Sequence, residues 1–288
     1  MVNARLTDKS KFENKNKEII MSERRSLDTL CAALSYAMKT EAPNCAAEAN
    51  TELVTYIDEK FGERGVERIF MYNPDAIGEW VYKKYPQLLA EVTMRTDLEV
   101  NFETVMPSVT PVCFGTMYTG AQPSVHGIRK YEKPVIKIDS LFDAMIRCGK
   151  KCAIVADRDC SMASIFLERE MDYYLFDTIP EINAKAAELI LEDKYDLICV
   201  YNGNFDGVMH RFGPESIEAL AELRANAQAF ATFCELIEKN WNHDTLIGFA
   251  MDHGCHAIDG GCGSHGLDME EDLYIAHLYK AVKCRKNV

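Results

Sequence analysis

The chain has 288 residues and a formal net charge of −13, from 32 basic and 45 acidic side chains. Its 48% hydrophobic and 27% charged residues are typical of a globular protein and exclude a disordered chain. The acidic balance argues against nucleic-acid binding by phosphate neutralisation, because that needs clustered Lys and Arg. A phosphate-ester substrate is still compatible with this charge, because bound metal ions can reverse the charge of a pocket.

The location of the protein follows from its apolar segments and its cysteines. No window approaches the roughly 18–20 consecutive apolar residues of a membrane span, and the first residues lack the apolar core of a signal peptide. Three of the eleven cysteines, Cys31, Cys152 and Cys199, lie inside apolar segments, where free cysteine behaves as a small buried hydrophobe. We therefore expect a cytoplasmic protein with no membrane association.

The first part of the chain differs in character from the rest. Residues 1–20 are polar and basic and have no apolar periodicity, which suggests contact with a neighbouring chain. Apolar residues at helical spacing predict helices over 26–40 and 50–62, with Gly62 as a stop signal. We expect residues 1–65 to form a helical N-terminal extension that serves as a lid or as an arm of a homo-oligomer.

From residue 66 onward, short apolar runs alternate with amphipathic stretches, and we see no repeat and no low-complexity segment. The runs are 68–72, 151–156, 173–176, 195–201 and 246–251, and the amphipathic stretches are 77–88, 140–147, 182–191 and 215–239. Continuous apolar strands between helices predict an α/β fold with a parallel-dominated central sheet and helices on both faces. This α/β domain is expected to span residues 66–288.

Three of the predicted strands run directly into an aspartate, namely Asp75, Asp206 and Asp252. A single aspartate in this position is usually a turn residue or a helix cap. In open α/β sheets, however, ligands bind just beyond the carboxyl ends of the strands. Three carboxylates at that edge would repel one another unless cations held them, so the sequence predicts a cation site there.

Histidines accompany these aspartates. His210 is four residues after Asp206, so the two share a face if the segment is helical, and His253 directly follows Asp252. Imidazole and carboxylate together suit zinc or manganese. An alternative is a small structural zinc knuckle in the glycine-rich stretch 254–266. Its ligands would be Cys255, His256, Cys262 and His265, although cysteines seven apart fit zinc-finger spacing poorly.

In a further segment, residues 106–128, Thr110 lies where a helix is predicted to begin. Pro111 sets φ for a first helical turn, and Thr110 is expected to cap that helix. Thr110 can therefore be an ordinary cap. Its hydroxyl would also face the positive end of the helix dipole, which favours an alkoxide and an attached phosphate.

Four segments in order resemble the nucleotide pyrophosphatase/phosphodiesterase-like branch of the alkaline phosphatase superfamily. Residues 107–128 resemble its nucleophile motif, a Thr followed by a helix, then Thr-Gly, Pro and His-Gly-Ile. The Asp-x-x-x-His motif at 206–210 is followed by Gly-Pro, and Asp-His-Gly and Ser-His-Gly occupy 252–254 and 264–266. The resemblance implies an alkaline-phosphatase-like fold that lacks a large cap domain.

The same resemblance implies two divalent metal ions, most plausibly zinc and otherwise manganese. One ion would be held by Asp206, His210 and His265. The other would be held by Asp75, Asp252, His253 and Thr110. Three carboxylates and one alkoxide would balance the charge of the two ions, so each buried charge has a partner.

The chain departs from the family pattern in three places. Relatives have Asp-Gly where this chain has Asp75-Ala76, and they often carry an Asn where spacing places Tyr131. Tyr131, Arg129 or Lys130 could supply the missing contact to the phosphate. Only 252 − 210 = 42 positions separate the second and third motifs, where many relatives insert the cap.

The implied reaction is hydrolysis of a small-molecule phosphate ester, of phosphodiesterase or nucleotide pyrophosphatase type. Thr110 would be the nucleophile, forming a phosphothreonine intermediate. A phosphomonoesterase or a phosphomutase on the same fold is an alternative. A catalytically silent, metal-stabilised binding protein is an alternative of another class. A sulfatase is disfavoured, because Cys113 lacks the Cys/Ser-x-Pro-x-Arg context of those relatives.

Overall fold

The computed structural model describes residues 24–285, so the expectation for residues 1–20 lies outside the described residues. The strands are β1 (Arg25–Ser26), β2 (Arg68–Pro74), β3 (Leu98–Glu103), β4 (Cys152–Asp157), β5 (Asp172–Phe176), β6 (Leu197–Asn202), β7 (Thr245–Ala250), β8 (His256–Ile258), β9 (Cys262–Ser264) and β10 (Tyr274–Val282). The helices are α1 (Thr29–Ala37), α2 (Thr51–Phe61), η1 (Gly62–Arg64), α3 (Glu79–Lys84), α4 (Ala90–Thr93), α5 (Thr110–Thr119), α6 (Pro123–His126), α7 (Leu141–Arg147), α8 (Ser161–Ile165), α9 (Ile179–Glu192), α10 (Asn204–Phe212), α11 (Ile217–Asn240) and α12 (Glu270–Leu273).

Eight of the strands form one sheet in the order β1-β3-β10-β7-β2-β6-β4-β5. Only β10 runs antiparallel to its neighbours, so among the described residues the predicted parallel-dominated sheet is confirmed. The five expected apolar runs correspond to β2, β4, β5, β6 and β7. The sequence pattern missed β1, β3 and β10. In β3, buried and exposed residues alternate, because it lies near the sheet edge and is not a continuous apolar run.

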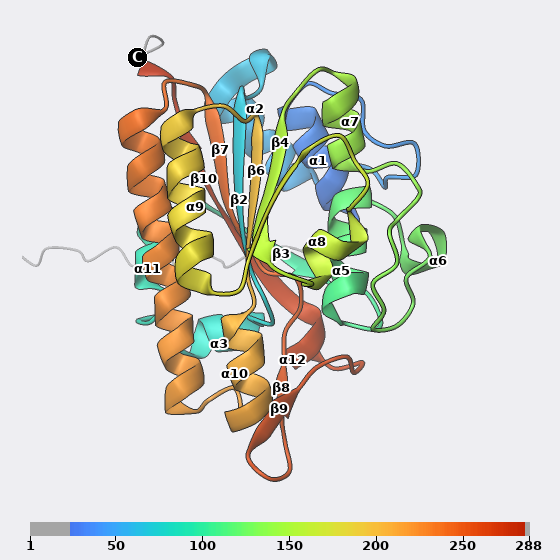
Figure 1. The fold of residues 1–288 in the computed structure, drawn as a ribbon, viewed down its shortest axis with the longest axis vertical. Coiled ribbons are helices and arrows are strands. Elements are labelled where there is room, and N and C mark those ends of the chain that lie inside the picture. Colours follow the sequence, from blue (N-terminus) through green and yellow to red (C-terminus); the bar gives the residue numbers. More distant parts are fainter. Residues whose placement is uncertain (1–23, 286–288) are drawn as a thin grey trace, which may run out of the picture.

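Helices cover both faces of the sheet, as expected (Figure 1). Helices α9, α10 and α11 lie on one side, and α1, α5, α7 and α8 lie on the other. The central strands β2, β6 and β7 are buried almost throughout, which agrees with their apolar sequences. Helix α5 is buried along its whole length, so it shows no amphipathic pattern.

The helical N-terminal region packs into the same core as the sheet. Buried residues of α1 and α2 include Leu30, Leu34 and Ile57, and α1 contacts both α5 and α7. Gly120, which ends α5 at φ 69°, lies where α5 contacts the N-terminal region. A Cβ there would lie 2.6 Å from the Cβ of Ala46, so a larger residue would push the N-terminal region away. A role for residues 1–65 as a lid or oligomer arm stays a prediction.

The segment between the second and third motifs contains no cap domain. After α10, helix α11 runs for 24 residues along the sheet and leads directly into β7. Within residues 24–285, no helix combines the length and the apolar character needed to cross a membrane.

Candidate metal centre and active site

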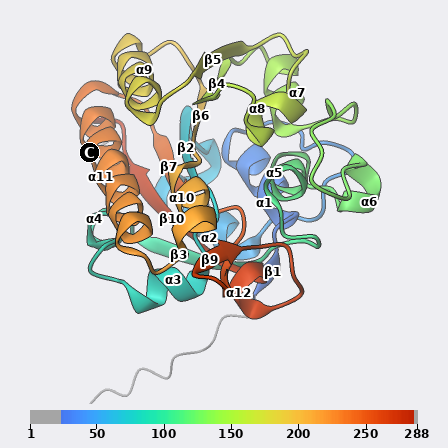
Figure 2. The same ribbon diagram turned by 60° about the horizontal axis from the view of Figure 1, so that its bottom comes forward.

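The three aspartates come from three neighbouring parallel strands. Strand β2 lies between β7 and β6 and pairs with both in parallel register. Asp75 follows β2 directly, Asp252 follows β7 after one residue, and Asp206 lies in the first turn of α10 after β6. Their carboxylates therefore meet at one edge of the sheet, as predicted. Figure 2 shows α10, α12 and the β8–β9 hairpin gathered at this edge.

One cluster at this edge is buried and consists of Asp75, Asp252, His253 and Thr110. Nε2 of His253 lies 3.3 Å from Oδ1 of Asp75 and 3.4 Å from Oδ2 of Asp252. The Thr110 hydroxyl lies 3.3 Å from the same Nε2 and 3.4 Å from Oδ2 of Asp75. The structure thus brings the expected nucleophile and the expected ligands of one metal together.

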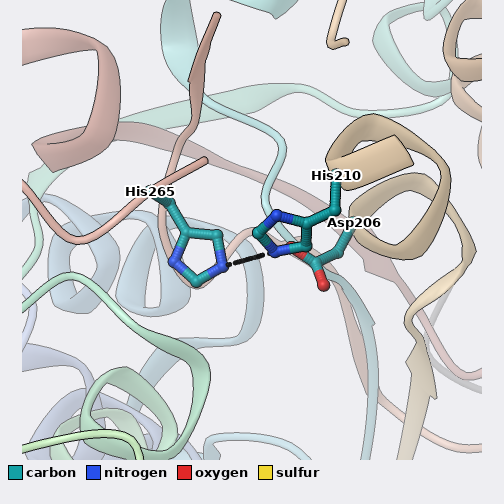
Figure 3. Close-up of side chains that lie close together, drawn as sticks. All are labelled: Asp206, His210 and His265. Carbon is teal, nitrogen blue, oxygen red and sulfur yellow. Dashed lines mark hydrogen bonds and ion pairs between the residues drawn. The ribbon is translucent and has the colours of Figure 1, made fainter. Parts of the chain in front are cut away.

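A second cluster contains Asp206, His210 and His265 and is more open to solvent (Figure 3). Helix α10 places Asp206 and His210 on one face, with Nε2 of His210 3.2 Å from Oδ1 of Asp206. Nε2 of His265 lies 3.3 Å from the same oxygen. The His210 side chain is 40% exposed. The ring centroids of His253 and His265 are 4.2 Å apart, so the two clusters are adjacent.

Each of the three histidines is oriented by a backbone carbonyl. Nδ1–H of His210 donates to the Gly263 carbonyl at 3.0 Å, that of His253 to its neighbour Gly254 at 2.9 Å, and that of His265 to Ser108 at 3.1 Å. This arrangement leaves every Nε2 as an acceptor that points into the clusters. The Nε2 atoms of His210 and His265 are only 3.1 Å apart, so a cation is needed between them, either a metal ion or, without metal, a proton on one of the rings.

The carboxylates also have free ligand atoms. Oδ1 of Asp75, Oδ1 of Asp206 and Oδ2 of Asp252 are buried and have no hydrogen-bond partner among residues 24–285. A buried charged oxygen without a partner is costly, and metal coordination is one way to satisfy it. Each of these oxygens lies within 3.4 Å of a histidine Nε2. The donor set therefore fits two divalent ions of the zinc type.

The position of Thr110 differs in one respect from the expectation. Val109, not Thr110, is the N-cap of α5, and Thr110 is the first helical residue. The prediction that Thr110 caps the helix was therefore wrong. Its hydroxyl faces Asp75 and His253, so it makes no capping hydrogen bond to α5.

The electrostatics of the metal-free clusters follow from burial and like charge. Burial and the charge of Asp252 raise the pKa of Asp75 well above its usual value, and burial raises the pKa of Asp252 to about 8. Burial lowers the pKa of His253, which favours the neutral ligand form. The adjacent Asp206 carboxylate raises the pKa of His210 to about 9.

We expect the metal-free protein to lose stability as pH rises from about 6.5 to about 8, where Asp252 is protonated only in the folded state and the buried His126, His253 and His277 are neutral in both states. The pKa of Asp252 is higher in the folded protein than in the unfolded chain, so unfolding in this range releases a proton. Each such proton changes the free energy of unfolding by about 1.4 kcal/mol per pH unit. Thermal melts of chelator-treated protein at several pH values would measure this. Metal-loaded protein, in which the ions replace the protons, is the control, and a melting temperature that rises with pH after chelation would contradict the expectation.

The zinc knuckle is wrong. Nδ1 of His256 bonds Oδ1 of Asp272 at 2.7 Å, and burial raises the pKa of the Cys255 thiol. His265 lies with Asp206 and His210 instead. Within residues 24–285, the two groups of potential metal ligands are those described above, and neither contains a cysteine.

The three residues expected to contact phosphate lie on the surface. Arg129 donates to the Ser124 carbonyl at 3.2 Å, Lys130 pairs with Glu132 at 3.3 Å, and Tyr131 is 60% exposed. The structure gives none of the three a hydrogen bond or an ion pair with Thr110 or the metal-ligand clusters, within residues 24–285. Their contact with a substrate phosphate stays a prediction.

Two residues around Asp75 were missed by sequence reasoning. The hydroxyl of Tyr201, the next-to-last residue of β6, donates to Oδ2 of Asp75. A polar ring at a strand end beside the aspartates was the available signal. Ala76 adopts φ 61° and donates its N–H to Oδ1 of Asp252 at 3.1 Å. Ala76 thus takes the left-handed conformation that a glycine adopts without strain, which reconciles Asp75-Ala76 with the Asp-Gly of relatives.

Fold and site together define an α/β protein of the alkaline phosphatase type, with two acid–imidazole clusters and a buried threonine at the carboxyl edge of its sheet. The family of type I phosphodiesterases / nucleotide pyrophosphatases matches residues 159–282, which include all expected ligands except Asp75 and Thr110. No curated protein matches the chain by sequence. This match over part of the chain, together with the fold, supports the predicted resemblance to the nucleotide pyrophosphatase/phosphodiesterase-like branch of the alkaline phosphatase superfamily.

Solved structures share this fold. Mouse ectonucleotide pyrophosphatase/phosphodiesterase 5 superposes with a TM-score of 0.56 at 16% identity, covering 67% of this chain and 58% of that one. An inactive threonine-to-alanine variant of the mouse protein in complex with AMP gives the same score and identity, with 67% and 59% covered. The human protein gives a TM-score of 0.50 at 16% identity, with 66% and 57% covered. This chain thus spans less than two thirds of the length of these relatives.

Proposed function

We propose that the chain is a two-metal phosphate-ester hydrolase of phosphodiesterase or nucleotide pyrophosphatase type, with Thr110 as its nucleophile. The observation that carries this proposal is the position of the Thr110 hydroxyl. It lies 3.3 Å from a histidine Nε2 and 3.4 Å from a carboxylate, inside a buried cluster whose charges have too few partners. A purely structural metal site has no need of a hydroxyl in this place.

In this proposal the residues of the chain divide the work. Asp75, Asp252 and His253 would hold one ion beside Thr110, and Asp206, His210 and His265 would hold the other. When bound, the ions would lower the pKa of the hydroxyl and of water and would stabilise charge on the leaving oxygen. Tyr201, through its hydrogen bond, would keep the Asp75 carboxylate in place beside Thr110.

The chemistry would proceed in two displacements. Thr110 Oγ attacks phosphorus and loses its proton to solvent, while the bond from phosphorus to the leaving alkoxide or aryloxide breaks. A water then attacks the phosphothreonine, which releases the phosphate product and restores the hydroxyl. The open cluster around His210 is where water and a leaving group can enter, because it is the more solvent-exposed of the two.

Two findings support this proposal beyond the geometry. The matching family is that of type I phosphodiesterases / nucleotide pyrophosphatases. The related mouse protein is described as inactive when a threonine is replaced by alanine, and that variant holds AMP. Both favour a nucleotide-like phosphodiester over other esters.

The surroundings of Arg129 and Lys130 help to decide whether the substrate is a phosphate diester or a monoester. A monoester carries a second negative charge that usually needs a cation besides the metals. Lys130 is paired with Glu132, and Arg129 is bonded to a backbone carbonyl, so both are engaged elsewhere. This arrangement favours a diester; monoesterase and mutase activity are the alternative outcomes of the assay.

The assay compares bis(p-nitrophenyl) phosphate, p-nitrophenyl phosphate and the p-nitrophenyl ester of thymidine monophosphate, each with added zinc or manganese. Metal content is measured on the same sample. We expect two ions per chain and faster turnover of the two diesters. Full metal occupancy without turnover of any ester would contradict the proposal and favour a metal-stabilised binding protein.

Location and assembly belong to the same proposal. We propose that the chain acts in the cytoplasm on a small-molecule ester, and all eleven cysteines, which are free in the structure, support a reducing environment. Self-association through residues 1–65 would be tested by the mass of the protein in dilute solution. A monomer would exclude the oligomer arm.

A further inference from the structure

The loop of residues 253–267 links the two metal-ligand clusters, and an expected metal-binding histidine lies near each of its ends. In the chain, His253 lies before the β8–β9 hairpin and His265 lies directly after it. In the hairpin, His256 pairs with Ser264, the residue before His265. The relative position of His253 and His265 therefore depends on how the two ends of this loop are held together.

Asp272 of α12 holds both ends of the loop. Its side chain is fully buried, with Oδ1 accepting from Nδ1–H of His256 at 2.7 Å and Oδ2 from the Leu267 N–H at 2.9 Å. Its backbone carbonyl accepts from the Gly254 N–H at 2.8 Å. Gly254 follows His253 directly, and Leu267 is two residues beyond His265. One residue thus bonds next to a ligand of each cluster.

The backbone around Gly254 is tightly packed, so the segment that carries His253 cannot move independently of α12. A Cβ on Gly254 would lie 1.9 Å from the Glu271 carbonyl oxygen, so α12 and the His253 segment are in backbone contact. The Cα of Gly78 lies 3.0 Å from the same Cβ position. On the other side, the indole N–H of Trp80 donates to the Cys255 carbonyl at 2.7 Å. A shift of α12 would therefore move His253.

We propose that Asp272 is a positioning residue that fixes His253 and His265 relative to each other and so sets the geometry of both metal sites. Asp272 contacts neither Thr110 nor the expected metal-ligand atoms, and it acts through the loop backbone. The inference rests on the proposed two-metal function. Outer residues that orient metal-binding histidines typically change metal affinity about 10–100-fold when removed.

The experiment compares Asp272→Ala and Asp272→Asn with the matched controls Asp268→Ala and Asp268→Asn. Asp268 is an exposed carboxylate on the same loop, so its variants remove the same charge near the site. The first readout is zinc affinity at each of the two sites, measured on metal-free protein by competition with a chromophoric chelator. The second is amide hydrogen exchange over residues 253–267 in the metal-free protein.

We expect Asp272→Ala to weaken zinc binding at both sites by about 10–100-fold and to speed exchange of the Leu267 and Gly254 amides. In Asp272→Asn, the amide oxygen can still accept from Leu267, and the amide group can donate to the other tautomer of His256. That variant should therefore recover most of the affinity. Both Asp268 controls should behave like the wild type.

A separate variant keeps the inference testable if Asp272→Ala does not fold. His256→Ala removes one of the two side-chain contacts and should cause a smaller loss, with faster exchange near the hairpin and protection retained at Leu267. Unchanged zinc affinity in His256→Ala, and in Asp272→Ala where that variant folds, would overturn the inference, and so would a loss at one site only. So would equal losses in the Asp268 controls.

The outcomes separate this inference from the proposed function. A wild-type chain that binds two zinc ions but cleaves no ester refutes the hydrolase and leaves the affinity comparison to decide the role of Asp272. A wild-type chain that binds no zinc at either site overturns both. Turnover that depends on Thr110, together with unaltered zinc affinity in Asp272→Ala and His256→Ala, refutes only the positioning role.

Discussion

Replacing Thr110 with alanine is expected to reduce turnover of a phosphate diester on the order of 10^4–10^6-fold. The hydroxyl is the only group of this side chain that can attack phosphorus, and it lies against His253 and Asp75 in a buried cluster. Metal content should stay near that of the wild type, because three of the four expected ligands of that ion are retained. Steady-state kinetics with elemental analysis of the same preparation would measure both quantities.

Thr110→Ser is the matched control, since it keeps the hydroxyl and loses only a methyl group. It should retain far more activity than the alanine variant. Rapid acid quenching of the wild type during turnover should trap a phosphothreonine that mass spectrometry locates at Thr110. An alanine variant that cleaves diesters at the wild-type rate would show that Thr110 is not the nucleophile.

Removal of the divalent ions is expected to lower activity to the background rate, and zinc or manganese should restore it. Without the ions, three buried carboxylate oxygens lack a partner, and two histidine Nε2 atoms face each other at 3.1 Å. The catalyst would then lack the charge that stabilises the attacking and leaving oxygens. Assays after dialysis against a chelator, followed by titration with each metal, would show this.

Substituting one expected metal ligand in each cluster is the control for the chelation experiment, because each substitution should remove one ion without a chelator. Asp252→Asn alters the buried cluster beside Thr110, and Asp206→Asn alters the open one. We expect each variant to bind about one ion in place of two. Each should lose most of its activity, because both ions would be needed to stabilise the attacking oxygen and the leaving oxygen. Full activity in the presence of excess chelator would rule out the two-metal proposal.

Much of the fold could be predicted from local patterns. Continuous apolar runs marked β2, β6 and β7, because strands covered on both faces need apolar side chains at every position. The aspartates that follow these strands could be placed at one edge, because parallel strands share their carboxyl ends. Motifs with this spacing also predicted the resemblance to phosphodiesterases that the family match over residues 159–282 supports.

Other features could not be predicted from local sequence patterns. Strand β3 was missed because its alternating pattern is weak. The knuckle was wrong because His256 bonds Asp272 and the Cys255 thiol is buried. The cap assigned to Thr110 was wrong because a local helix signal cannot show that a hydroxyl has a stronger partner elsewhere. The orienting carbonyls of Ser108, Gly254 and Gly263 carry no side-chain signal at all.

The sequence by itself determined the elements, the ligand types and their order, since helical spacing, apolar runs and short motifs are local properties. The tertiary structure alone decided which atoms meet. Thr110 and His253 are 143 residues apart, and Tyr201 and Asp75 are 126 apart. Their contacts arise from the order β7-β2-β6 in the sheet, from the packing of α5 on one face of the sheet and from the position of α12 beside the β8–β9 hairpin. Long-range strand pairing of this kind depends on the whole core, and no local pattern encodes it.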